Sequence, residues 1–248
     1  IKGETPATEP TTQVTTGDEA ITITPQSEGG VISEDTEWTD ETTLAENLTI
    51  AEEKTLTLKG QVTISGDVTI SGGTIKRGEA FKDYMIVVPE GSSLTLKDVK
   101  IDGGAVWEGS EDATIGRGTE NSGVKATSAM IYNFGTLTVK SGTILENNDN
   151  TTTSGAIATK DEETGEYTFP SVTDKVQFGG AVLNGGLMEI SGGTIRNNNV
   201  GWRGAGIASY GKIEMTGGTI SGNYARNSWG DGGAIYLSGK KNDTGEDY

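Results

Sequence analysis

The sequence predicts an all-β protein, folded as a right-handed parallel β-helix of roughly seven to eight coils with an N-terminal extended and capping segment. Two repeated elements and the composition lead to this prediction. Short apolar–polar–apolar stretches recur along the chain, with the two-residue period of a half-buried strand. Glycine accounts for 38 of the 248 residues, whereas hydrophobic residues make up only 32%. A thin core that runs through stacked repeats fits this composition better than one thick core does.

The N-terminal part of the chain differs from the rest. Residues 1–20 are rich in Thr, Pro and Glu and carry no aliphatic pattern, so we expect a solvated acidic linker there. Residues 21–43 are expected to cap the β-helix, and its coils are expected over residues 44–240. Residues 241–248 are expected to be a tail or a truncation point, because an open β-helix end exposes unpaired strand edges. The chain is therefore expected to be part of a longer multidomain protein.

The first repeated element is a pair of short strands that ends in Gly-Thr-Ile. Its clearest copies are Val68–Ile75, Leu137–Ile144, Met188–Ile195 and Ile213–Ile220. We expect the final isoleucines to stack inward in one core column. The threonines before them are expected to form an outward column: Thr74, Thr143, Thr194 and Thr219. Asparagines follow three of these copies, and we expect corners there, because Asn tolerates the left-handed conformation and can stack into side-chain ladders.

The second repeated element is a short glycine-flanked apolar strand. Its central residues are Ile131, Ile157, Val182, Ile207 and Ile235, with spacings of 26, 25, 25 and 28 residues. About 25 residues without a helical period is the length expected for one coil of a β solenoid. The stretch from Ile131 to Val182 is therefore expected to span two coils. Residues 160–176 within it are expected to form a loop or hairpin insertion.

The composition excludes several classes of function. The chain has no Cys and no His, which excludes disulfides, zinc-thiolate sites and triads built on imidazole. Its net charge of −17 opposes binding to nucleic acid or anionic lipid. No apolar run approaches the ~20 residues of a membrane-spanning helix. We predict no metal site and no cofactor, because the acidic segments match no calcium-binding motif.

An aromatic corner near the C-terminal coils is the predicted ligand-binding site. Trp202 and Trp229 precede successive copies of the second element by nearly the same distance, so they should lie at one corner of adjacent coils. Trp107 is a candidate first member of the same column. The predicted ligand-binding residues are Trp202, Arg203, Tyr224, Arg226, Asn227, Trp229 and Asp231. Indole rings can stack on the flat faces of sugars. The same rings could instead cover loop backbone.

A pair of stacked carboxylates is the candidate catalytic site. Glu189 and Glu214 hold the same position in successive copies of the first element and should point outward from adjacent coils. Retaining glycosidases need two carboxyl groups roughly 5 Å apart, so this spacing permits catalysis. Asp231 is a third candidate. Equivalent positions elsewhere hold threonine, so this column could also be merely polar.

The elements Thr194–Asn198 and Thr219–Asn223, together with the Gly-Gly-Ala strands, resemble the repeats of chlamydial polymorphic outer-membrane proteins. They also look like the pectate-lyase-like β-helix repeats of large bacterial surface proteins. Leu48–Gly66 is similar to the first coils of such proteins from Gram-positive gut bacteria. The resemblance implies an extracellular protein, secreted or on the bacterial cell surface, that serves as an adhesin, a glycan binder or a glycan-cleaving enzyme.

We therefore expect an adhesin or stalk module that binds a host or dietary glycan or glycoprotein. One alternative is a glycoside hydrolase, or part of one, on a β-helix scaffold. The other alternative is a purely structural spacer.

Overall fold

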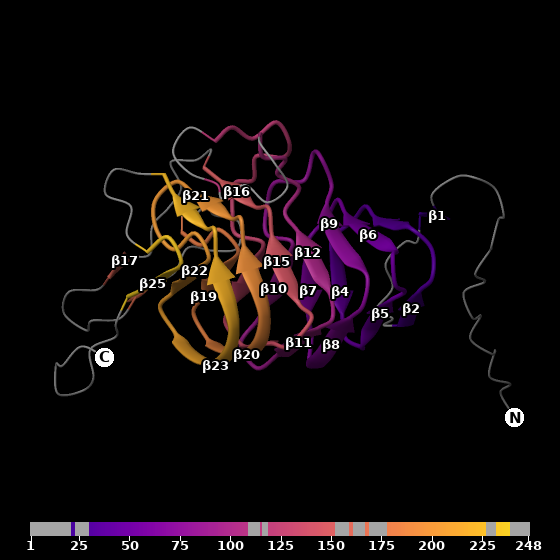
Figure 1. Ribbon diagram of the computed structural model, residues 1–248. Coiled ribbons are helices and arrows are strands. Elements are labelled where there is room, and N and C mark those ends of the chain that lie inside the picture. Colours follow the sequence, from indigo (N-terminus) through magenta and orange to yellow (C-terminus); the bar gives the residue numbers. More distant parts are fainter. Residues whose placement is uncertain are drawn as a thin grey trace, which may run out of the picture.

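The computed structural model describes residues 30–108, 115, 119–151, 178–226 and 232–238, together with the backbone of residues 21–22, 159–160 and 167–168. These residues contain strands, turns and loops but no helix. Nearly all of their strand pairs are parallel. The prediction of an all-β, parallel-stranded solenoid is confirmed (Figure 1).

The strands form three stacked rows, and the first two rows are joined into one 13-stranded sheet. The first row contains β2 (Gly30–Ile32), β5 (Leu48–Ile50), β8 (Asp67–Ser71), β11 (Ser93–Lys97) and β14 (Thr136–Val139). The second row contains β1 (Ile21–Thr22), β3 (Thr36–Trp38), β6 (Thr55–Leu58), β9 (Thr74–Arg77), β12 (Lys100–Asp102) and β15 (Ile144–Glu146). Two long strands run through both rows, β20 (Leu187–Arg196) and β23 (Lys212–Ser221).

The third row is a separate seven-stranded sheet. It contains β4 (Thr42–Leu44), β7 (Val62–Ile64), β10 (Ile86–Val88), β13 (Ile131–Asn133), β19 (Val182–Asn184), β22 (Ile207–Ser209) and β25 (Ile235–Leu237). A small sheet at one corner contains β16 (Asp149–Asn150), β21 (Asn199–Val200) and β24 (Tyr224–Ala225). One further pair, β17 (Thr159–Lys160) and β18 (Tyr167–Thr168), is antiparallel.

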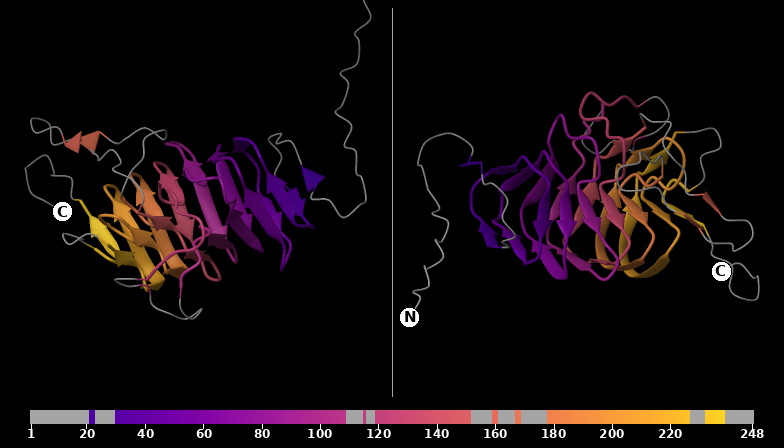
Figure 2. Two further views of the ribbon diagram at one scale, coloured as in Figure 1. Left: turned by 90° about the horizontal axis from the view of Figure 1, so that it is seen from above. Right: turned by 180° about the vertical axis from the view of Figure 1, so that it is seen from behind.

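The chain visits the three rows in turn and then moves on by one strand. Thus β2, β3 and β4 are followed by β5, β6 and β7, and each strand pairs with its counterpart from the winding before. Figure 2 shows the windings side by side along one axis, from indigo to yellow. The parallel stacking already includes β2 and β3, which lie within the segment 21–43.

The core is a narrow stack of aliphatic side chains inside the windings. In the second row, Ile101 of β12 pairs with Leu145 of β15, and Leu145 pairs with Ile195 of β20. All three side chains are buried. Burying one such side chain stabilises the fold by about 1.5–3 kcal/mol before cavity effects are counted. The repeated aliphatic pattern therefore produces the continuous core that the sequence predicted.

The predicted inward position of Ile144 is wrong by one residue. Ile144 pairs with Lys100 and Thr194, which belong to the outward column, whereas its neighbour Leu145 takes the inward place. Thr143 is buried and lies outside the predicted threonine column. The cause is a turn between β14 and β15 that is one residue longer than the corresponding turn in β20, which moves each later side chain by one position.

The prediction of two coils between Ile131 and Val182 is also wrong. These two residues pair directly across β13 and β19, so the intervening residues belong to a single winding. Ile157 lies outside the described residues. The antiparallel pairing of β17 with β18 is what a hairpin near residues 160–176 would contain.

The predicted asparagine corners are present. Asn147 and Asn197 have φ angles of 59° and 55°, in the left-handed region. The next residue in each winding forms a ladder. The backbone N–H of Asn148 donates to Oδ1 of Asn198 over 3.1 Å, and Nδ2 of Asn198 donates to Oδ1 of Asn223 over 3.0 Å. These bonds satisfy polar groups at the corner, where the strands of the second row end.

Candidate functional site

The predicted aromatic corner contains a packed cluster around Trp202. The Trp202 ring stacks on Phe178 with a centroid distance of 5.7 Å and an interplanar angle of 17°. The guanidinium of Arg203 lies 5.4 Å from the centroid of Trp202 and 4.9 Å from that of Tyr236, and its Nη1 donates to the Tyr236 hydroxyl over 3.0 Å. Trp202 and Arg203, which are consecutive in the chain, therefore belong to one packed cluster with Phe178 and Tyr236.

This cluster covers an apolar outer surface of the third row. The outward residues of that row pair in register, from Tyr132 through Leu183 to Ala208, and all three are buried. The Trp202 ring is itself partly buried against them. Its Nε1 is buried and meets no acceptor within the described part of the chain. Trp202 therefore packs as a covering residue more than as an open sugar platform.

The other predicted ligand-binding residues have different partners. Tyr224 lies on β24 and pairs with Asn199 of β21. Arg226 donates from Nη2 to the backbone oxygen of Thr119 over 2.6 Å. Trp107 donates from Nε1 to the backbone oxygen of Asn197 over 3.1 Å. The remaining three predicted residues lie outside the described residues: Asn227, Trp229 and Asp231.

Glu189 and Glu214 are neighbours in adjacent strands, as the repeats predicted. Each has a polar partner. Thr138 donates from Oγ1 to Glu189 over 3.0 Å, and Lys212 forms an ion pair with Glu214. The hydrogen bond and charge of Glu214, and to a lesser extent the charge of Glu189, raise the pKa of Lys212. One lysine thus counterbalances the stacked carboxylates on an exposed surface.

A second charged column was not predicted from the sequence. It follows the outward positions of the second row, one residue beyond the inward column. Its members are Glu37, Thr57, Lys76, Asp102, Glu146 and Arg196. These residues lie in repeats of unequal length, so their common register becomes visible only when the strands are paired. A search for alternating charges at the residue after each inward position could have found part of it.

The middle of this charged column is a cluster of partly buried charges. Nε of Arg196 lies 2.7 Å from Oε2 of Glu146, whose side chain is only 8% exposed, and Nζ of Lys100 lies 3.7 Å from Oε1. Asp102 is the strand neighbour of Glu146. Burial raises the pKa of Asp102, and a hydrogen bond from the backbone N–H of Gly104 and the charge of Lys100 oppose this effect. The two adjacent carboxyl groups therefore have different electrostatic surroundings.

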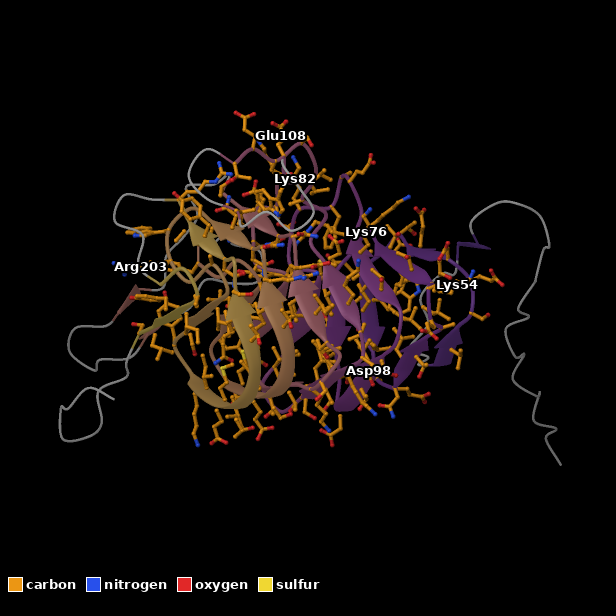
Figure 3. The ribbon with its side chains drawn as sticks, in the orientation of Figure 1. Lys54, Lys76, Lys82, Asp98, Glu108 and Arg203 are labelled. Atoms are coloured by element: carbon orange, nitrogen blue, oxygen red, sulfur yellow. The ribbon has the colours of Figure 1, made fainter. Side chains whose placement is uncertain are left out.

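The N-terminal end of the charged column opens into a groove of about 760 Å³. The outer faces of β3, β6 and β9 form its floor, and residues 78–83 form a wall. The loop between β12 and β13 contributes Thr127 to the lining. Its lining consists of Glu37, Thr57, Lys59, Lys76, Arg77, Gly78, Glu79, Ala80, Phe81, Lys82, Asp83 and Thr127. Figure 3 labels Lys76 and Lys82 along the same upper side of the molecule.

Arg77 lies beneath this groove and is fully buried. Its guanidinium carbon lies 5.6 Å from the centroid of the Phe81 ring, and it donates to the backbone oxygen of Asp83 and to Asn148. Its Nε has no hydrogen-bond partner among the described residues. Burial lowers the pKa of Arg77 to about 9, although the charge of Asp83 opposes the shift. A cation without a carboxylate contact therefore lies under the groove.

Comparison with known proteins adds no functional assignment. No family model matches the chain, and no curated protein or solved structure matches it. Function must therefore be inferred from the groove, the charged column and the aromatic cluster. Among the described residues, no helix is long and apolar enough to cross a bilayer, and no group of three or more potential metal ligands converges.

Proposed function

We propose that this chain is an extracellular module of a bacterial surface protein and that it binds a host or dietary glycan or glycoprotein. In this proposal the groove over β3, β6 and β9 holds the sugar. The solenoid presents this groove on its outer wall, as an adhesin or stalk would.

The finer features of the fold belong to the same proposal. We interpret the solenoid as a right-handed parallel β-helix in which each strand of the seven-stranded third row marks one coil. Residues 21–43 would then cap its N-terminal end. The parallel pairing of β1 with β3 supports this interpretation, because β1 covers the edge of the second row.

The observation that carries the functional proposal is the half-buried ring of Phe81 in the groove. A sugar ring offers C–H faces that pack on an aromatic ring and hydroxyls that require polar partners. Thr57, Thr127 and Glu79 provide such partners in the same lining. The groove therefore combines an apolar contact with polar groups. The ring of Phe81 packs against the core and over Arg77, as that of Trp202 packs on Phe178, but Phe81 also lines the groove and Trp202 does not.

Retention on immobilised glycans tests the proposal. The wild-type chain should be retained on a subset of glycans, and Phe81→Ala should lose at least tenfold in affinity. Trp202→Ala provides the matched comparison, because it removes a ring from the aromatic cluster and leaves the groove intact. Circular dichroism of both variants establishes that they fold. Loss of retention in Trp202→Ala but not in Phe81→Ala would move the site to the aromatic cluster, and no retention by the wild type would favour a structural spacer.

Glycoside hydrolysis is the second candidate function. It is favoured by the neighbouring carboxyl groups of Asp102 and Glu146, because the raised pKa of Asp102 suits a proton donor and Glu146 lies beside it in contact with Arg196. Release of new reducing ends from a retained glycan, abolished in Asp102→Asn and Glu146→Gln, would establish this activity. Retention without cleavage would exclude it for that glycan.

A further inference from the structure

We propose that the groove selects glycans with an anionic sugar unit, one that carries a carboxylate or a sulfate, and that Lys76 and Lys82 bind this group. This inference rests on the proposed function and names the class of sugar that the groove accepts.

The charges of the groove differ from those of the rest of the chain. The chain as a whole has 36 acidic residues against 19 basic ones. The groove lining has four basic residues, Lys59, Lys76, Arg77 and Lys82, against three acidic ones, Glu37, Glu79 and Asp83. A locally positive surface on an otherwise acidic protein concentrates anions at that place.

Several of these charges already have partners. Lys59 lies 2.6 Å from Glu37, and Oδ1 of Asp83 accepts a hydrogen bond from Thr127 over 3.1 Å. Lys76 and Lys82 form no ion pair within the described part of the chain, and both side chains are exposed. They can therefore bind an incoming anion without first breaking an ion pair, although the charge of Lys76 also acts on Asp102, its neighbour in the next strand.

Arg77 adds a fixed positive charge beneath these lysines. It is buried, and its hydrogen-bond acceptors among the described residues are uncharged: the backbone oxygen of Asp83 and the side-chain oxygen of Asn148. The charge of the Asp83 side chain compensates it in part, without an ion pair in the described part of the chain. A buried charge interacts over a longer range than an exposed one, because less water screens it. An anion in the groove would lie above this charge and would compensate part of the cost of burying it.

Phe81 places the sugar ring next to the charged group. Its ring lies over the guanidinium of Arg77 and lines the same groove as Lys82, the next residue in the chain. A sugar unit that packs on Phe81 would thus have its acidic substituent near the lysines. The aromatic contact provides affinity for the ring, and the lysines provide the preference for the anion.

Titration calorimetry with three hexasaccharides of one backbone tests this inference. One hexasaccharide is neutral, one contains a uronic acid and one carries sulfate. At low salt the wild-type chain should bind at least one of the two anionic forms about tenfold more tightly than the neutral form, and the preference should decrease as salt is raised.

Two double variants distinguish anion binding by the groove lysines from a non-specific attraction of the anion to any lysine on the surface. Lys76→Ala/Lys82→Ala should remove the preference, so that the anionic hexasaccharides bind no more tightly than the neutral one, because Phe81 remains and the lysines are gone. Lys97→Ala/Lys140→Ala removes the same charge from exposed positions outside the groove and should keep the preference. Equal binding of the neutral and anionic forms, or loss of the preference in the control variant, would overturn this inference while the proposed function stands. Absence of binding to all three would overturn both.

Discussion

Nη2 of Arg77 donates a hydrogen bond to Oδ1 of Asn148 over 3.1 Å, although 71 residues separate them in the chain. Asn148 is also the first member of the ladder that continues through Asn198 and Asn223. The cation beneath the groove is thus hydrogen-bonded to an asparagine ladder at the corner of the solenoid. This ladder takes one asparagine from each of three windings. This contact fixes the position of Arg77 and links the groove to the most polar part of the interior.

Replacing Arg77 with Met should change the pH dependence of stability. Burial lowers the pKa of Arg77 to about 9 in the folded chain, well below its ordinary value. Between these two values the unfolded chain holds a proton that the folded chain has released. The unfolding free energy of the wild type should therefore rise with pH in this window, relative to that of Arg77→Met. Urea unfolding of both proteins at pH 7.5 and 10.5 measures the effect. A difference between the two proteins that does not change with pH would contradict it.

The asparagine ladder should contribute strongly to stability. Asn198 is buried, accepts from the backbone N–H of Asn148 and donates to the backbone oxygen of Leu145. Asn198→Ala leaves these groups unsatisfied and should lower the unfolding free energy by about 2–4 kcal/mol. Asn223→Ala, at the half-buried end of the ladder, should cost clearly less. Equal losses in chemical denaturation would show that the ladder is not the cause.

Neutralising the two adjacent carboxyl groups should have opposite effects at pH 7. Burial raises the pKa of Asp102, so ionising this group opposes folding at neutral pH. In the wild-type chain the backbone N–H of Gly104 donates to Oδ1 of Asp102 over 2.9 Å. The side-chain oxygen of Asp102→Asn can still accept this bond, so this variant should stabilise the chain. Its advantage should disappear as the pH falls below the ordinary pKa of 3.8, where Asp102 becomes protonated in both the folded and the unfolded chain.

Glu146→Gln should instead destabilise the chain, because it removes the charge that Arg196 and Lys100 contact. Since Arg196 is partly exposed, we expect a loss of about 1–2 kcal/mol. Thermal unfolding of both variants at pH 7 and pH 3 provides the measurement. Stabilisation by Glu146→Gln at pH 7 would mean that the cluster is dominated by repulsion between carboxylates.

The register of β15 predicts a sharp contrast between two neighbouring residues. Leu145→Ala removes a fully buried side chain from the inward column and should cost about 2–5 kcal/mol. Ile144→Ala changes an outward side chain and should cost no more than about 1 kcal/mol. Denaturant unfolding measures the loss of unfolding free energy in each variant. A larger loss in Ile144→Ala than in Leu145→Ala would mean that Ile144 points inward, as the repeat alone predicted.

The repeats predicted the fold because every winding needs aliphatic side chains at its inward positions, where they are buried against the next winding. This need makes the apolar pattern recur along the sequence. The same reasoning failed at Ile144, where a turn longer by one residue reverses inside and outside without changing the Gly-Thr-Ile letters. It also failed between Ile131 and Val182, because a spacing of about two repeats can hold one winding with an insertion as well as two windings. Spacing alone does not distinguish these cases, whereas strand pairing does.

The candidate site was harder to predict. The pairing of Glu189 with Glu214 followed from two equal repeats, and it is present. The groove combines Lys59, Lys76 and Phe81 from different windings and a wall loop, and no repeated motif marks these residues. A second ladder was not predicted. In it, Asn133 donates to Asn184 over 2.6 Å, and Asn184 donates to Ser209 over 2.9 Å. These residues end apolar strands that are separated by unequal numbers of residues, so no regular repeat marks them.

Amide chemical-shift mapping of the isotope-labelled chain, titrated with the uronic-acid hexasaccharide, tests the location of the site most directly. We expect the largest shift changes on residues 57–59 and 76–83 and on Thr127, which surround the groove. Largest changes at Trp202, Arg203 and Tyr236, with the groove unaffected, would contradict it.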